Sequence, residues 1–175
     1  MTDPTTEPDA SAPAVDWDPA SDPDGLTWED VQSRDAYLDF LLDLYFDTAD
    51  QGRGALGLTL TVGGAVVSGI AISRAEWIER SVALLASPDT TPASEHLDQI
   101  WNRLHGRYVE VSKRRDDAGL PIRARRFVHM RDVRILNGHS TDVSLWRGAL
   151  ADVSGWTIGS WNPPGTLTSE QESGA

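Results

Sequence analysis

The segment Gly138–Asp142, with the sequence GHSTD, places a serine, a histidine and an aspartate side by side. It is the first candidate for nucleophilic catalysis. A nucleophile elbow needs a small residue two places after the serine, because its strand-to-helix turn is crowded, and Asp142 occupies that place. Neighbours on an extended chain also point to opposite sides, whereas folding assembles a triad from separate segments. We therefore expect a polar hairpin turn here, and we expect that the protein is not an enzyme.

The segment Gly52–Gly57, GRGALG, carries the letters of a dinucleotide fingerprint. That fingerprint works where it follows a strand and opens a helix, but here it follows a helical pattern and opens a strand pattern. We interpret it as a joint between the two. The four histidines lack the spacing of a zinc site, and the chain has no cysteine that could serve as a co-ligand. We expect no cofactor and no metal.

Basic residues concentrate between Arg103 and Arg134, where ten bases stand against four acids. Such a patch could neutralise nucleic-acid phosphates, contact an acidic protein surface or hold an acidic segment of the same chain. As a fourth alternative, it could simply solvate a helix end and the loop that follows. The candidates for partner binding, which are not catalytic, are Arg123, Arg125, Arg126, Trp146 and Arg147.

Helical periodicity indicates which elements precede and follow the first strands. Apolar residues between Tyr37 and Tyr45 recur on one face, which predicts a helix from Thr27 or Ser33 to about Thr48. Ser73 and Glu76 form a capping-box pattern for a short helix. A longer helix is expected from Pro92 to Gly119. Its predicted apolar face comprises Leu97, Ile100, Trp101, Leu104, Tyr108 and Val111.

Between the first and second helices the pattern changes from a period of 3.6 to a period of 2. Leucine and valine alternate with glycine and threonine over residues 56–62, and Gly63-Gly64 can form a tight turn into residues 65–73. Gly69 suggests a bend or bulge. Residues 126–136 and 143–159 are also β-rich. We predict an α+β fold with a small antiparallel, barrel-like sheet and a helical insertion over about residues 74–118.

The acidity of the chain is concentrated at its N-terminus. The 175 residues carry a net charge of −12, and residues 1–30 hold nine acids and no lysine or arginine. Their proline-rich, apolar-poor composition predicts a disordered tail over 1–30, ahead of one folded domain over 31–162 and a polar tail over 163–175. No signal-peptide pattern and no apolar span of membrane length is present, so we expect a cytoplasmic protein without membrane contact.

Three ordered blocks resemble the gas vesicle accessory proteins of the GvpU type. They are LTLTVGGAVVSGIAIS at 58–73, VHMRDVRIL at 128–136 and LWRGALADVSGWTIG at 145–159. The resemblance covers about residues 33–160. It implies a non-catalytic accessory factor that binds vesicle proteins or the shell surface and influences vesicle assembly or clustering, and self-association is a further expectation. The acidic tail would mask the arginine patch until a stronger acidic partner competes.

The order of a leading helix, a hairpin with a mid-strand glycine and a late Arg-Gly strand also looks like the layout of Sm-like barrels. Fold similarity does not carry function. It does keep a second interpretation open, in which segment 103–134 binds nucleic acid, although we expect nucleic acid to be the less favoured partner.

Overall fold

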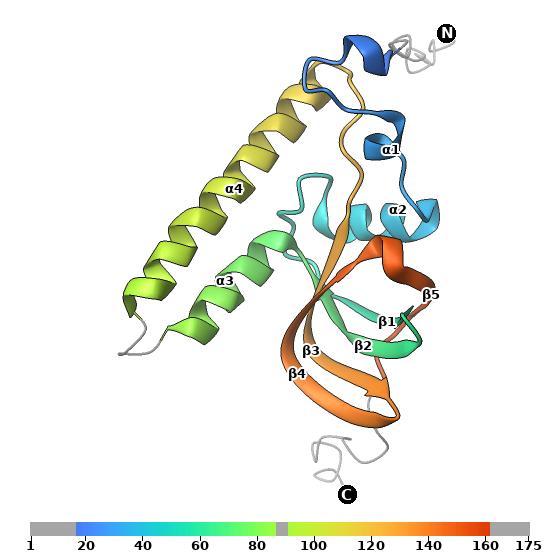
Figure 1. Cartoon of the computed structure of the whole chain (residues 1–175), viewed down its shortest axis with the longest axis vertical. Helices are drawn as coiled ribbons and strands as arrows, with labels where there is room; N and C mark the ends of the chain where they lie inside the picture. The colour runs from blue at the N-terminus through green and yellow to red at the C-terminus, as the bar shows by residue number, and fades with distance from the viewer. Residues whose placement is uncertain (1–16, 87–90, 162–175) are drawn as a thin grey trace, which may run out of the picture.

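The computed structural model describes residues 17–86 and 91–161. One five-stranded antiparallel sheet gathers the early and late β segments in the order β4-β3-β2-β1-β5. The strands are β1 (Leu56–Val62), β2 (Ala65–Ile72), β3 (Phe127–Asn137), β4 (His139–Ala149) and β5 (Val153–Ile158). The described residues also form four α-helices at one end and one side of the sheet, which confirms the α+β class (Figure 1).

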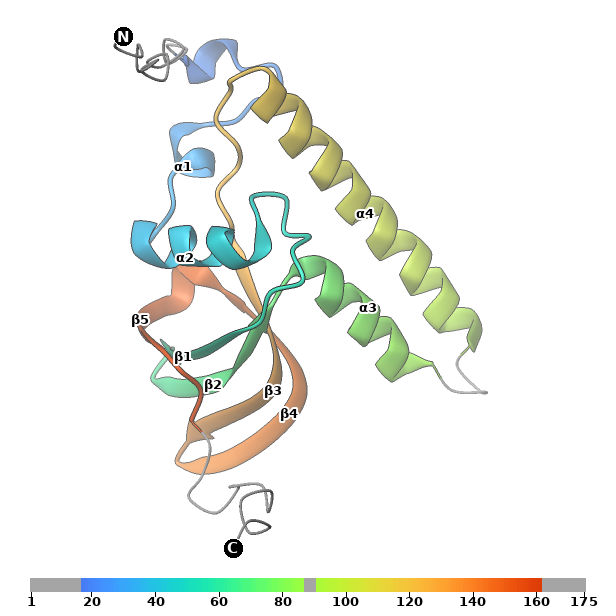
Figure 2. The same cartoon turned by 180° about the vertical axis from the view of Figure 1, so that it is seen from behind.

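The predicted barrel is wrong, because the sheet is open. β4 and β5 form its two edges, and within the described residues the strand pairing does not join them. Closure requires tilt and stagger that bring the first and last strands within hydrogen-bonding distance. Here a single 3-10 turn over Leu150–Asp152 links the edge strands, and the sheet curls without closing (Figure 2).

The β1–β2 hairpin forms as its sequence pattern predicts. Leu56, Leu58 and Leu60 are buried on one face of β1, and Gly63 and Gly64 make the turn with φ of +56° and +82°. Two consecutive residues with positive φ define the turn type that matches the right-handed twist of paired strands. This hairpin therefore fixes the register of the centre of the sheet.

A bulge lies where Gly69 of β2 faces β3. The register shifts between Ser68 and Ile70, and Asp132 on β3 has φ of +51°. A Cβ on Gly69 would lie 2.9 Å from the Arg131 carbonyl oxygen and 2.9 Å from a methyl carbon of Val133. The glycine therefore permits the close backbone approach that the bulge requires.

The predicted leading helix is two helices, α1 (Trp28–Val31) and α2 (Ala36–Phe46). The chain extends between them, and the Asp35 carboxylate starts α2 by accepting hydrogen bonds from the backbone N–H groups of Tyr37 and Leu38, each at 3.0 Å. Local capping thus outweighs the continuous apolar pattern. The core forms where α2 covers the sheet with Leu38, Leu42 and Phe46.

The helical pair between β2 and β3 consists of α3 (Arg74–Leu85) and α4 (Thr91–Asp117). Ser73 caps α3 by accepting a hydrogen bond from the Glu76 N–H at 3.3 Å. α4 extends well beyond α3, so that one end lies beside α3 and the other reaches the N-terminal segment (Figures 1 and 2). The long helix therefore links α3 to the N-terminal segment, and the sheet does not make this connection.

Residues 17–30, which the composition assigned to the acidic tail, have a defined fold. A 3-10 turn at Pro19–Ser21 precedes α1, and the Trp17 and Trp28 rings meet edge to face at 4.8 Å. Trp17 and Leu26 are buried. Residues 17–30 of the predicted tail are therefore folded. The predictions for residues 1–16 and 163–175 lie outside the described residues.

Candidate binding pocket and its charge network

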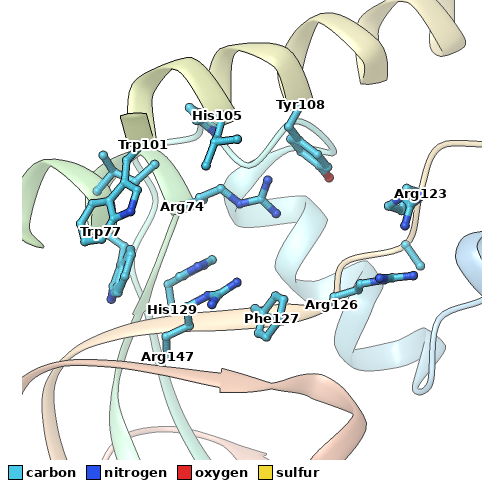
Figure 3. Close-up of a pocket in the computed structure, with 13 residues that line it drawn as sticks. Arg74, Trp77, Trp101, His105, Tyr108, Arg123, Arg126, Phe127, His129 and Arg147 are labelled. Carbon is cyan, nitrogen blue, oxygen red and sulfur yellow. The ribbon is translucent and has the colours of Figure 1, made fainter. Parts of the chain in front are cut away.

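A pocket of about 450 Å³ lies between the helical pair and the sheet. Trp101, His105 and Tyr108 extend into it from one face of α4, and Trp77 closes the side next to α3 (Figure 3). β3 and β4 form the opposite wall with Phe127, His129 and Arg147, while Arg74, Arg123 and Arg126 complete the polar lining. The described lining residues include four arginines and two histidines and no carboxylate.

Cross-strand pairing places the polar groups of the sheet wall. His129 on β3 lies directly opposite Arg147 on β4. The Arg147 guanidinium carbon lies 3.5 Å from the centroid of the Phe127 ring, and that of Arg74 lies 4.0 Å from the centroid of the Tyr108 ring. Aromatic faces attract cations, so both guanidinium groups are held beside apolar surface.

The electrostatic environment of this pocket disfavours additional positive charge. Burial lowers the pKa of Arg147, and the nearby Arg74 lowers it further. Burial likewise lowers the pKa of His129 well below its usual range, with Arg74, Arg147 and Arg125 contributing. Burial and Arg74 lower the pKa of His105 in the same direction. At neutral pH both histidines are therefore uncharged, while the arginines keep their charge.

A buried carboxylate, Asp50, connects three elements behind the pocket. It lies after α2, accepts a hydrogen bond from the Arg74 N–H at 3.0 Å and pairs with Arg125 at 2.6 Å. Its second oxygen lies 3.6 Å from Arg74 Nε and 3.9 Å from His129 Nδ1. Burial opposes the charge of Arg125, yet attraction to Asp50 and Asp43 gives this side chain a raised pKa.

A second charge cluster fastens the far end of α4 to the N-terminal segment. Arg115 is 1% exposed and contacts Asp22 through both terminal nitrogens, at 3.0 and 2.6 Å, and Asp24 at 2.9 Å. Arg114 also pairs with Asp24. The hydrogen bonds from Arg115 hold the pKa of Asp22 well below its ordinary range. Another acid of the N-terminal segment, Asp30, pairs with both Arg123 and Arg126.

The structure brings together only some of the predicted partner-binding residues. Arg123, Arg126 and Arg147 line the pocket, whereas Arg125 points to Asp43 and Asp50. Trp146 is partly buried against the core, and its ring lies over Gly148. Partner binding by these five residues stays a prediction.

The motifs that first suggested chemistry have structural positions. Gly138 turns β3 into β4 with φ of +75°, as the hairpin interpretation predicts. The other four residues of the motif belong to β4, where Asp142 pairs with Arg134 at 2.6 Å. Gly52 lies in the turn after α2, where a Cβ would lie 2.7 Å from the Phe46 Cα. Among the described residues, no three histidine or acidic side chains are grouped to hold a metal ion.

Sequence reasoning did not single out Asp50 or Arg74, and it missed the burial of Arg115. Asp50 lies in the turn after α2 and Arg74 begins α3, whereas Arg115 belongs to the basic segment for which an acidic segment of the same chain was one of the predicted partners. The single usable signal was a charged residue at an otherwise apolar helical position, since Arg115 follows Tyr108 at a spacing of seven. Burial of these groups depends on partners distant in sequence.

Fold and pocket together define a small α+β protein with an open antiparallel sheet and a basic, aromatic pocket under a helical pair. The model of a family described as "Gas vesicle protein GvpU-like" matches residues 39–161, well over half of the chain. The chain therefore belongs to the GvpU-like gas vesicle protein family, as the three sequence blocks indicated. No curated protein and no solved structure matches it.

None of the helices in the described ranges is both long and apolar enough to cross a membrane. α4 is the longest of them, and charged side chains recur along it.

Proposed function

We propose that this protein is a non-catalytic accessory factor of gas vesicles that acts in the cytoplasm. It binds vesicle proteins or the shell surface and so influences vesicle assembly or clustering. The observation that carries this proposal is the family match over residues 39–161.

The outer face of α2 supports a binding role. Tyr37, Phe40 and Leu44 lie at a spacing of three and four residues and are 82%, 71% and 69% exposed, while the opposite face of α2 enters the core. Aromatic and aliphatic side chains gathered on one face are typical anchors of protein interfaces. We assign this stripe, called the α2 face, to contact with a gas vesicle protein.

The arginine candidates would act beside the pocket. Arg147 supplies positive charge there that no carboxylate of the described residues pairs with, whereas Arg123 and Arg126 would have to exchange Asp30 for an acidic region on the partner. Nucleic-acid binding is less well supported, because Arg115 is buried and Arg123 and Arg126 already pair with Asp30. Paired arginines release fewer counterions on contact with phosphate.

The test is flotation with isolated gas vesicles, which rise on centrifugation and carry bound protein with them. The wild-type chain should rise with the vesicles. The double variant Phe40→Ser, Leu44→Ser should bind about tenfold more weakly, because two exposed apolar anchors are lost. Both positions are solvent-exposed, so the free energy of unfolding of the variant should stay within about 1 kcal/mol of the wild-type value.

The matched control is Leu84→Ser on α3, because Leu84 is 61% exposed and lies outside the α2 face. It should rise with the vesicles as the wild type does. A wild-type chain that stays in solution would contradict the proposal. So would steeply salt-dependent binding to an RNA oligomer without vesicle binding.

A further inference from the structure

We propose that the pocket under α4 binds a small organic anion, one acidic group carried on an aromatic or otherwise apolar body. This site is independent of the α2 face and of vesicle binding. A volume of about 450 Å³ lies within the range of pockets that hold small molecules. The lining combines ring surfaces with guanidinium groups, and this combination selects such a ligand.

The pocket has more positive charge than its neighbours compensate. Within the described part of the chain, no ion pair joins Arg147 to a carboxylate, and its contact is the Phe127 ring. Arg74 faces Asp50 at 3.6 Å, but that carboxylate also serves Arg125 at 2.6 Å. An anionic ligand group between Arg147 and Arg74 would reduce the repulsion between them.

The apolar part of the ligand has a defined place. The Trp77 and Trp101 rings lie 5.4 Å apart, and Trp77 also contacts the His129 ring at 5.2 Å. Tyr108 and Phe127 line the opposite part of the pocket, as the close-up shows (Figure 3). Flat aromatic surfaces on two sides favour a ring or chain that lies between them.

Two buried polar groups in the lining also lack partners within the described residues. Both ring nitrogens of His105 and Nε1 of Trp77 are buried without a hydrogen bond. Buried polar atoms without partners are rare and costly in folded proteins. His105 extends from α4 toward the pocket, so a ligand could supply the missing contact (Figure 3).

The experiment compares two fluorescent probes with the same aromatic body. 8-Anilinonaphthalene-1-sulfonate carries a negative charge, and N-phenyl-1-naphthylamine does not. Each is titrated against the full-length protein, with dye fluorescence and tryptophan quenching as readouts. We expect the anionic probe to bind at least about tenfold more tightly, which is the effect of one charge-assisted contact. Equal affinities for the two probes would overturn the proposal.

Three variants locate the site. Arg147→Gln should remove the preference for the anionic probe and leave the uncharged probe nearly unchanged, while Arg147→Lys should keep part of it. Arg107→Gln, on the exposed side of α4, is the matched control and should change nothing. An equal loss in Arg107→Gln, or a loss of binding in Phe40→Ser on the α2 face, would place the probe elsewhere and overturn the assignment.

Discussion

Arg115 carries a full charge at a position that water does not reach. Its guanidinium holds Asp22 and Asp24, and its Nε donates to the Pro121 carbonyl at 2.7 Å. Because the folded pKa of Asp22 lies below its unfolded value, this contribution to stability is present above about pH 4 and is lost as the pH falls further. At neutral pH both partners remain charged.

Removing one partner of this pair should be costly. Arg115→Gln leaves the Asp22 side chain without its counter-charge, and we expect a loss in the free energy of unfolding, measured by urea denaturation, that clearly exceeds the loss caused by Arg114→Gln. The matched change, Arg114→Gln, affects a side chain that is 58% exposed and contacts the same Asp24. It should cost less than about 1 kcal/mol. Equal effects of the two variants would contradict the inference that the contacts of Arg115 with Asp22 and Asp24, which we call the α4 clamp, stabilise the fold.

At the scale of elements, the bulge between β2 and β3 determines how the sheet curls toward the pocket wall. It lies beside Arg131 and Val133 and shifts the register ahead of His129. The β3–β4 register runs past this bulge without a shift, so His129 stays opposite Arg147 while the bulge changes how β3 lies on β2. A glycine on the central strand thus affects how the strand that carries His129, three strands from the β5 edge, packs against its neighbour.

Gly69→Ala should therefore destabilise the sheet by about 1–3 kcal/mol, because its Cβ would meet the Arg131 carbonyl and Val133 without space to move. Gly155→Ala on β5 is the matched control, since a Cβ there meets nothing within 4 Å. Its stability should change by less than about 0.5 kcal/mol. Thermal unfolding of both variants measures the difference, and a tolerated Gly69→Ala would show that the bulge is not required.

At the scale of the whole molecule, the N-terminal segment and α4 hold each other in place. Asp22 and Asp24 fix the end of α4, while Asp30 pairs with Arg123 and Arg126 beside the pocket. The segment that carries these acids lies ahead of residue 39, where the family match begins. The clamp on α4 is therefore supplied from outside the matched region.

Two deletions separate this clamp from the remainder of the N-terminus. Removing residues 1–30 should lower the hydrogen-exchange protection of residues 109–117 by at least about tenfold, because Arg115 loses its partners. Removing residues 1–16 should leave this protection unchanged. If partner affinity and its salt dependence are the same with and without residues 1–30, the masking hypothesis is wrong.

The sequence by itself determined the elements that depend on local chemistry. Alternating leucines specified β1, Gly63-Gly64 specified its turn, Gly69 marked the bulge and Ser73 marked the start of α3. Each of these signals acts within a few residues, because side-chain alternation, positive φ and capping are local properties. The family blocks, likewise, could be recognised from the order of residues.

Tertiary structure alone decided what is buried and what is paired. The apolar pattern of α4 predicted an inward Leu104, yet that side chain is 62% exposed and the buried positions include His105, Ser112 and Arg115. The open sheet and the folding of residues 17–30 were also missed. A charged side chain can be buried only where it has a partner, and that partner can be distant in the sequence. Arg115 and Asp24 are 91 residues apart in the chain, yet they pair at 2.9 Å. Such pairing follows from topology and leaves no local pattern.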